Sequence, residues 1–402
     1  MSTARVVVTG AGVFSPLGAG LEEFERRLWA GESAVEPSVR FPGAVTAEFH
    51  ELNVQPWLGS KGIRVLDRSA RLLAVATHMA LCGTGVSNEI GEEGDPDLGL
   101  VCATMFGSVH SITSFDWSGQ TEGVTLVNPM EFPNTVINSP AGQAAIKYKL
   151  RGVNSTICCG LSSGLQALHY AAEFLRFGRA RILLAGGVEE LCEESLGGFQ
   201  KTGIASASGS VRPFGADRDG TIPGEGSALW VLETEEGARA RGRTPRLEIC
   251  GFGTAQDAHS IQAYHVRGEG AATAIGQALE SSGIGPEQVA CIVASANGSS
   301  AGDEMEARAL RAVFGERLAE IPACAPKAAF GECMGVSGVL CAVAAGLALE
   351  RQSAPPTAGL AGSDSGLRLS LSAQPVSGEY ALVNAFGCDG NNASLVIRLC
   401  RN

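Results

Sequence analysis

The amino-acid sequence predicts a duplicated α/β fold, in which two consecutive units of similar plan each form a sheet covered by helices. Strand-like and helical segments alternate along the whole chain, and the layout of the first half recurs after a charged, Arg- and Gly-rich stretch at 235–245. Apolar residues make up 45% of the 402 residues, which is enough to fill a substantial core. We therefore expect two halves, residues 1–245 and residues 246–402.

A Val-rich strand opens the first half and leads into a glycine-rich turn at Gly10–Gly12. The full GxGxxG spacing of a nucleotide-binding loop is missing, and Pro16 interrupts the helix that such a loop needs, so no cofactor is expected there. Asp67 is a good N-cap for a helix that runs to about Leu81. Further helices are expected at 21–30 and 140–148, and buried strands at 98–103 and 181–187.

The segment Asn154–Leu168 predicts a short buried strand, a sharp turn and a helix with apolar residues at helical spacing. The start of that helix is the positive end of its macrodipole, which stabilises a thiolate, so this position favours a nucleophile. Here the residue is Leu161, whose side chain has no chemistry. Cys158 and Cys159 precede the turn, on the expected strand, where burial raises the pKa of a thiol.

The second half repeats this plan. Its expected strands are 247–253, 289–295, 323–326, 380–384 and 393–399, and its expected helices are 271–281, 302–314 and 335–349. Between the halves, the polar loop Arg212–Glu225 is too long for an ordinary connection, and we expect ion pairs through Arg212, Asp217 and Arg218 within it.

Composition excludes several classes of function. The formal net charge of −12, without a Lys/Arg run, argues against nucleic-acid binding. We expect no membrane span, because no apolar run approaches the length of about 18 residues that a span requires. Met1–Gly10 shows no charged-then-apolar pattern, so we expect no signal sequence, and the 12 scattered cysteines fit reduced thiols in the cytoplasm. The six histidines show no metal-ligand spacing, and none follows His265, so we expect no metal site.

Several separated motifs together resemble the β-ketoacyl synthase family of the thiolase superfamily. They are, in order, RVVVTGAGVFSPLG from Arg5, SSGLQAL from Ser162, LLAGGVE from Leu183, RPFGADRDG from Arg212, PKAAFGE from Pro326 and FGCDGNNAS from Phe386. The resemblance spans the chain from its first strand to its last. It implies a five-layered αβαβα fold, a two-fold dimer, and a Cys-His-His chemistry that condenses malonyl groups on acyl carrier protein.

All three catalytic positions that the resemblance implies have changed. The elbow cysteine is Leu161, the first histidine is Asn297 and the second is Glu332. The family's lysine is kept as Lys327, for which Glu332 and Glu306 are candidate carboxylate neighbours, and the gating phenylalanine of the FGFGG segment is Cys388. This pattern resembles chain length factors, the catalytically silent subunits that pair with an active ketosynthase in type II polyketide synthases.

This resemblance implies a heterodimer with an active ketosynthase, which would bring the reactive thiol and hold the growing polyketide chain. Aromatic-type chain length factors usually carry Gln at the elbow, so a partner in a synthase of reduced, polyene-type chains fits equally well. Because the chain is acidic, we expect acyl carrier protein to dock mainly on the partner. Candidates for the tunnel floor or the subunit interface are Val109, Ile112, Phe132, Thr135 and Ile157.

Two other functions remain open from the sequence. One is an autonomous acyltransferase or condensing enzyme that uses Cys159 as its nucleophile. The other is a homodimeric acyl-binding protein that condenses nothing. Glu332 and Asn297 could form a new acid/base pair, but because no thiol neighbours them we expect them to fill a vestigial pocket with hydrogen-bonded polar groups.

Overall fold

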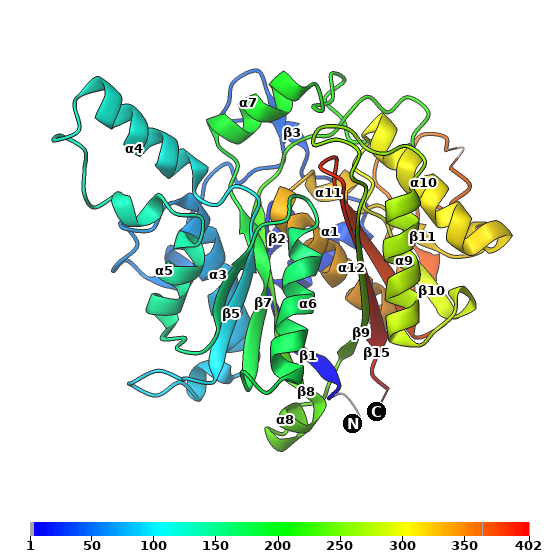
Figure 1. Ribbon diagram of the computed structural model, residues 1–402, viewed down its shortest axis with the longest axis horizontal. Coiled ribbons are helices and arrows are strands. Elements are labelled where there is room, and N and C mark those ends of the chain that lie inside the picture. The colour runs from blue at the N-terminus through cyan, green and yellow to red at the C-terminus, as the bar shows by residue number, and fades with distance from the viewer. Residues whose placement is uncertain (1–3, 364, 402) are drawn as a thin grey trace.

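The computed structural model describes residues 4–363 and 365–401 (Figure 1). The first half contains five strands in the order β6-β5-β7-β8-β1, with β5, β6 and β7 parallel and β8 and β1 antiparallel to their neighbours. These strands are β1 (Val6–Ser15), β5 (Leu98–Ala103), β6 (Asn154–Ile157), β7 (Ile182–Glu189) and β8 (Gly226–Thr234).

The second half repeats this order and these orientations as β11-β10-β14-β15-β9. Its strands are β9 (Leu247–Gln256), β10 (Val289–Val293), β11 (Ala323–Cys324), β14 (Tyr380–Phe386) and β15 (Asn391–Leu399). A short antiparallel pairing of Val6–Val8 with Leu247–Ile249 joins the two halves into one sheet path. Two-residue strands complete the set: β2 (Gly18–Ala19), β3 (Glu36–Pro37), β4 (Val45–Thr46), β12 (Ser353–Ala354) and β13 (Gln374–Pro375).

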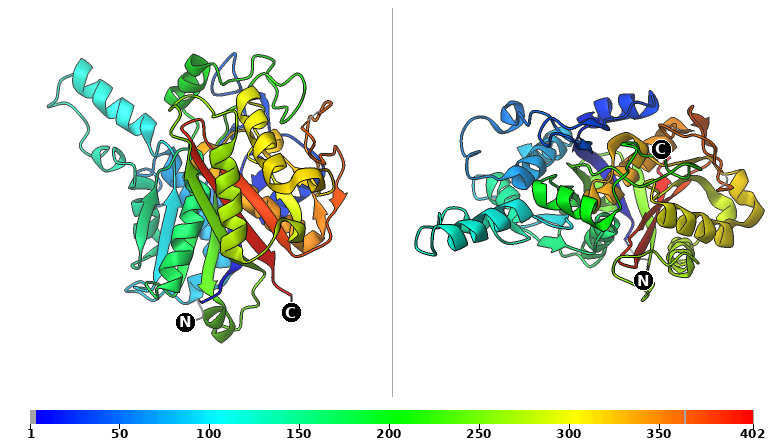
Figure 2. Two further views of the ribbon diagram at one scale, coloured as in Figure 1. Left: turned by 45° about the vertical axis from the view of Figure 1, so that its right-hand side comes forward. Right: turned by 90° about the horizontal axis from the view of Figure 1, so that it is seen from above.

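Helices form three layers around these strands. α6 (Ser163–Arg176) and α12 (Ser337–Arg351) pack against each other in the middle, between the two halves of the sheet. α3 (Arg68–Gly83) and α5 (Ser139–Tyr148) cover the outer face of the first half, and α9 (Glu269–Ser282) and α10 (Ser300–Phe314) cover that of the second. The five-layered αβαβα prediction is therefore confirmed (Figure 2).

The remaining helices are short or peripheral. They are α1 (Leu21–Trp29), α2 (Gln55–Leu58), α4 (Val109–Thr121), α7 (Glu193–Thr202), α8 (Glu235–Ala240) and α11 (Lys327–Phe330), with 3-10 turns η1 (Val86–Asn88), η2 (Phe132–Asn134), η3 (Pro286–Gln288), η4 (Gly315–Ala319) and η5 (Met334–Val336). α4 projects away from the body of the molecule (Figures 1 and 2), and none of its residues is buried.

The alternation of side chains along each strand produces these layers. On β5, Val101 and Ala103 join the middle core, whereas Leu100 and Cys102 join the outer core beneath α3. On β14, Val383 joins the middle core in the same way, whereas the preceding residue, Leu382, joins the outer core of the second half. Both faces of these strands are apolar because helices cover both, as expected for parallel strands within an α/β sheet.

The helical segment Met334–Arg351 is long and apolar enough to cross a membrane by length and composition, but 89% of it is buried inside the protein. The expectation that no apolar run approaches this length was therefore wrong. The cause is position: α12 is enclosed by the two halves of the sheet and by α6, so apolar residues are favoured on all its sides.

Helix boundaries follow the capping signals in the sequence. α3 begins at Arg68, and the carboxylate of its N-cap Asp67 accepts a hydrogen bond from the Ala70 backbone N–H at 2.8 Å, as predicted. α6 ends at Arg176, and Gly178 adopts a left-handed conformation two residues later, with φ 64°.

Candidate functional site

The sequence-predicted elbow lies between β6 and α6. Gly160 occupies its tightest point with φ 58°, and a Cβ atom there would lie 2.1 Å from Oδ2 of Asp389. The turn is held by the Ser163 hydroxyl, which donates to the Gly160 carbonyl at 2.6 Å and accepts from the Cys159 N–H at 2.8 Å. The prediction that Leu161 is the first residue of the helix was wrong by two positions: α6 begins at Ser163 with Ser162 at its N-cap, so Leu161 lies in the turn just before the helix.

Leu161 belongs to a small apolar cluster. Its buried side chain packs with Phe199 of α7 and Met334 of η5, and partly buried Met105 and Ile204 lie against the same group. The space at the elbow is thus filled by apolar groups from four separate segments. No nucleophilic side chain is among them.

The other two changed positions meet in a buried polar centre. The Glu332 carboxylate accepts four hydrogen bonds: Oε2 from Lys327 Nζ and Asn297 Nδ2, both at 2.8 Å, and Oε1 from Ser337 Oγ at 2.6 Å and the Met334 N–H at 3.0 Å. Every member is at most 5% exposed. Since each carboxylate oxygen has two donors, the group is fully satisfied.

Met334 connects the apolar cluster to the polar centre. It has φ 50°, a left-handed conformation that a residue with a Cβ atom adopts infrequently. In this conformation its N–H donates to Glu332 while its fully buried side chain packs with Leu161. The structure therefore brings Leu161, Asn297 and Glu332 into one continuous region.

Lys327 is one of the largest buried side chains, with 2% of its surface exposed. Burial alone lowers the pKa of its ammonium group, but the adjacent Glu332 carboxylate outweighs burial and raises the pKa above its ordinary value. Lys327 is therefore charged, and its ion pair with Glu332 is desolvated. Of the two carboxylate neighbours that the sequence left open, Glu332 makes the contact.

Two more buried carboxylates hold the segment that carries Asn297. Asp303 accepts from the backbone N–H groups of Asn297 at 3.1 Å and Gly298 at 3.3 Å, and burial raises its pKa to about 6. Glu306 accepts from the Ser295 N–H, and burial raises its pKa to about 7. Beside them is a cavity of about 10 Å³, which is room for one water molecule at most.

Glu189 is a site residue that sequence reasoning missed. At the end of β7 it accepts from the backbone N–H groups of Met105, Phe106 and Gly335, at 2.6–3.0 Å, so it joins the loop after β5 to η5. Burial raises its pKa to about 7. The available signal was a carboxylate that ends the apolar run LLAGGV, because such a residue needs buried donors.

The long loop 212–225 contains the expected ion pairs. Arg212 pairs with Asp217, and Arg218 lies 4.0 Å from the Asp303 carboxylate, which ties the loop to the Asn297 segment. Its last residue, Glu225, pairs with Arg68 of α3 at 2.5 Å. That final contact spans 157 positions of sequence and was not anticipated.

The prediction that Cys158 and Cys159 lie on the strand was wrong. β6 ends at Ile157, so both lie in the turn, and Cys158 is exposed. Partial burial nevertheless raises the pKa of both thiols, and the nearby Asp389 carboxylate raises that of Cys159 further. Burial also raises the pKa of Cys388. None of the three has the environment of an activated thiolate.

The tunnel and interface candidates lie apart from the polar centre. Val109 and Ile112 are half-buried on α4, and Ile157 is half-buried on the edge strand β6. Thr135 is half-buried beside η2, and Phe132 is 62% exposed. Within this chain alone Phe132 is therefore not the floor of a cavity, because the segment that carries it projects outward.

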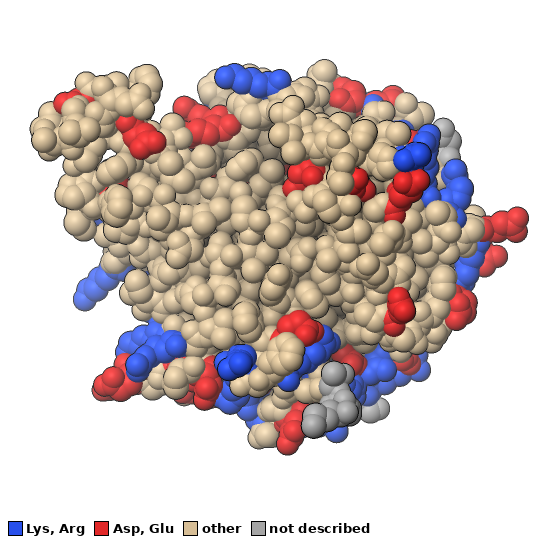
Figure 3. All heavy atoms as spheres, in the orientation of Figure 1, with Lys and Arg blue, Asp and Glu red and all other residues tan. Residues whose placement is uncertain are grey.

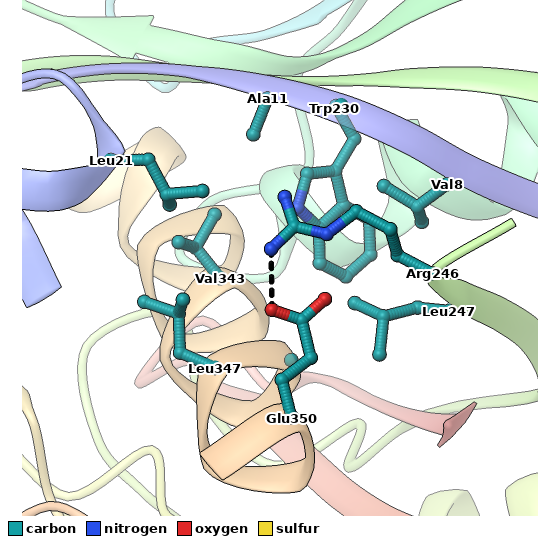
Figure 4. A pocket seen from close by; sticks show the side chains of 11 residues that line it. Val8, Ala11, Leu21, Trp230, Arg246, Leu247, Val343, Leu347 and Glu350 are labelled. Atoms are coloured by element: carbon teal, nitrogen blue, oxygen red, sulfur yellow. Dashed lines mark hydrogen bonds and ion pairs between the residues drawn. The ribbon is translucent and has the colours of Figure 1, made fainter. Parts of the chain in front are cut away.

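A separate crevice marks the seam between the halves (Figure 4). The ion pair of Arg246 and Glu350, at 2.5 Å, crosses it in front of Trp230. Its volume of about 20 Å³ admits little more than a water molecule. No group of three or more metal-ligating side chains occurs among residues 4–363 and 365–401.

Comparison with known proteins accounts for this architecture. Residues 3–238 match the family model of the β-ketoacyl synthase N-terminal domain, and residues 247–361 match that of the C-terminal domain. The chain belongs to the β-ketoacyl synthase family. The 3-oxoacyl-[acyl-carrier-protein] synthase 2 of Coxiella burnetii is 31% identical, over 99% of each chain.

Solved structures of the family are similar over its whole length. The ishigamide ketosynthase/chain length factor has a TM-score of 0.91 and 27% identity, covering 100% of both chains. A type II PKS acyl-carrier protein in complex with its ketosynthase bound to the hexaketide has a TM-score of 0.89 and 26% identity, covering 99% of this chain and 100% of that one.

Proposed function

We propose that this chain is a chain length factor, a non-catalytic subunit that pairs with an active ketosynthase and shapes the elongation tunnel of a type II polyketide synthase. The observation that carries the proposal is the filled centre. Leu161 places an apolar side chain at the elbow, and Glu332 uses the donors of Lys327 and Asn297. Decarboxylative condensation needs a thiolate and free donors at the reacting carbonyl, whereas in the described part of the chain the elbow position carries Leu161 and the donors of Lys327 and Asn297 are taken by Glu332.

A large apolar surface supports the pairing. On α4 and the segment that follows it, large apolar side chains are 62–81% exposed at Trp117, Val124, Leu126, Met130 and Phe132. Several large exposed apolar side chains gathered on one segment are typical of an interaction site. We call this segment, residues 109–137, the α4 arm.

The edge strand β6 and an uncharged face extend this surface. β6 pairs only with β5, so its outer edge has backbone groups available for another chain. Around it, the centre of the face shown in Figure 3 carries almost no Lys, Arg, Asp or Glu, which gather at the rim. Loss of charge toward the middle is typical of subunit interfaces.

A groove of about 590 Å³ lies between α6, β9 and α9. The rings of His169 and Phe252 stack in it at 4.2 Å, and Phe177 at its border is 73% exposed. We assign this groove to the partner ketosynthase as well, because it lies on α6, the element that directly follows β6 and the elbow.

In the proposed heterodimer, the α4 arm reaches the partner's acyl chamber. Val109, Ile112, Phe132 and Thr135, with Ile157 on β6, then limit the depth of the shared tunnel. Phe132→Ala should lengthen the products by admitting further two-carbon units, measured by mass spectrometry of the released chains. An unchanged product distribution would show that Phe132 does not lie at the tunnel floor.

Acyl carrier protein is expected to dock mainly on the partner, since both it and this chain are acidic. We propose a cytoplasmic setting, which agrees with the twelve cysteines being free thiols.

Co-expression with candidate ketosynthases tests the pairing. We expect a one-to-one complex by size exclusion and native mass spectrometry, and condensation of malonyl units only when both subunits are present. Condensation by this chain alone, or exclusive self-association in the presence of every ketosynthase tried, would contradict the proposal.

The second candidate is an autonomous condensing enzyme that uses Cys159. Its support is the 31% identity to enzymes named 3-oxoacyl-[acyl-carrier-protein] synthase 2. Against it stands the raised pKa of the Cys159 thiol. Incubation of the isolated chain with an acyl thioester distinguishes the two, because a stable mass increase on Cys159 supports the enzyme.

The third function is that of an acyl-binding protein. A homodimer that binds an acyl ligand without becoming acylated would support it.

A further inference from the structure

The surroundings of Glu332 have the composition of an anion-binding site. Four donors from four different elements converge on its carboxylate: the Lys327 ammonium from α11, the Asn297 amide from the loop before α10, the Met334 N–H from η5 and the Ser337 hydroxyl from α12. Such a mixture of one cation and several neutral donors is what a carboxylate prefers.

The arrangement of these donors does not depend on Glu332 alone. Ser337 is the first residue of α12, a helix whose N-terminal dipole favours negative charge. Asn297 is fixed by its backbone N–H to Asp303, and Lys327 is packed with 2% exposure. Each donor is thus positioned by its own element, so the donors would still face one another if the Glu332 side chain were removed.

Charge links Lys327 to the occupant of the site. Lys327 is buried, which by itself lowers the pKa of its ammonium group, and the Glu332 carboxylate at 2.8 Å opposes that desolvation and keeps the group charged. Among the described residues, Glu332 is the carboxylate within ion-pair distance of it. The other buried carboxylates nearby make no ion pair with Lys327: Asp303 accepts backbone N–H groups of Phe214, Asn297 and Gly298, and Glu306 accepts from the Ser295 N–H and the Asn384 amide through Oε1. A buried ammonium without a partner is strongly destabilising.

We propose that this polar centre is a carboxylate-binding site that the chain fills with its own Glu332. The tethered carboxylate takes the place that a small free carboxylate, or the carboxylate end of an acyl group, would otherwise occupy. Because it is tethered beside the donors, it competes with such ligands intramolecularly, at a high effective concentration. This inference goes beyond the pairing proposal, since it concerns the isolated chain and holds whether or not a partner binds.

Chemical rescue tests the site. Glu332→Ala removes the carboxymethyl part of the side chain and leaves a space of about the size of formate or acetate beside Lys327. We expect a melting temperature roughly 5–10 °C below that of the wild type in chloride. Formate or acetate at equal ionic strength should then raise it again, saturating with concentration, as a ligand that binds only the folded state does.

Two control variants isolate the site. Wild type should show no carboxylate-dependent shift, because Glu332 occupies the position. Glu332→Gln keeps the side chain's volume without its charge and should be destabilised but not rescued. Lys327→Met combined with Glu332→Ala removes the cation, and formate should then have no more effect than chloride.

Equal responses of wild type and Glu332→Ala to formate, or equal rescue by chloride, would overturn the inference. Should Glu332→Ala fail to fold in chloride, refolding is the readout: soluble protein in formate but not in chloride supports the site, and none in either contradicts it. Glu332→Asp, whose carboxylate is one methylene shorter, should lie between wild type and Glu332→Ala. Neither result depends on a ketosynthase, so failure here leaves the pairing proposal standing, and the reverse also holds.

Discussion

The buried polar centre and the α4 arm differ in almost every physical respect. At the centre, Lys327 and Glu332 are 2% and 1% exposed and both oxygens of the carboxylate are satisfied. On the arm, α4 has no buried residue, and Trp117 and Leu126 are 65% and 66% exposed. In an active condensing enzyme the centre has to receive a substrate. Here the centre is closed and the side chains of the arm are exposed, as the proposed pairing through the surface of this chain requires.

The largest effect is expected from breaking the centre. Lys327→Met leaves the Glu332 carboxylate buried beside an apolar side chain, because its only cationic partner is gone. The free energy of unfolding should fall by about 3–5 kcal/mol, measured by chemical denaturation. The double variant Lys327→Met/Glu332→Gln removes both charges and should recover a large part of the loss. If the single and double variants lost the same unfolding free energy, the unpaired Glu332 charge would not be the cause of the lost stability.

A smaller effect, on binding rather than on folding, is expected from the arm. Trp117→Asp with Leu126→Asp places two charges in the proposed interface, and should weaken pairing with a ketosynthase by about 100-fold. The melting temperature of the isolated chain should change little, since both side chains are exposed. Leu371→Asp is the matched control, because Leu371 is 63% exposed but lies in the second half. Equal weakening by this control would exclude the arm as the interface.

A third effect depends on pH. Burial raises the pKa of Glu306 from 4.5 to about 7, so the folded protein holds this proton more tightly than the unfolded chain does. Its contribution to stability is therefore full below pH 4.5 and is lost as the pH rises toward 7. Glu306→Gln should remove this dependence and flatten the decline in unfolding free energy between about pH 5 and 7 by roughly 2 kcal/mol. An unchanged slope in urea denaturation series would contradict this.

The smallest effect is expected at the elbow thiol. Cys159→Ser should alter condensation by the heterodimer less than about twofold, because a thiol whose pKa is raised by burial contributes little thiolate near neutral pH. Steady-state rates of the purified pair provide the measurement. A loss of tenfold or more in the steady-state rate would indicate that Cys159 of this chain takes part in the condensation, and would contradict the proposal.

Much of the fold was accessible from the sequence, because local patterns determine it. The apolar residues on both faces of β5 and β7, the capping carboxylate of Asp67 and the repeated order of elements each indicate one layer or boundary. The filled elbow was equally accessible, since Leu161 stands within an otherwise intact motif. Each of these features can be predicted from residues that are close together in the sequence.

The contacts within the buried polar centre around Glu332 could be predicted from the sequence only in part. The carboxylate partner of Lys327 could be narrowed to two candidates, but choosing Glu332 required the three-dimensional path of the turn after α11. The Ser337 and Met334 donors and the bond from Asn297, 35 positions away, follow from the packing of α12 against α6. The exposure of Phe132 could not be predicted from the sequence either, because the surroundings of this side chain depend on how far the arm projects from the body of the molecule.

Acylation of the assembled pair tests the central claim most directly. The purified heterodimer is incubated with an acyl thioester, and the intact mass of each subunit is then measured separately. If this chain is the non-catalytic subunit, the acyl group appears on the ketosynthase alone and this chain keeps its unmodified mass. An acyl group carried by this chain, at Cys159 or elsewhere, would contradict the account.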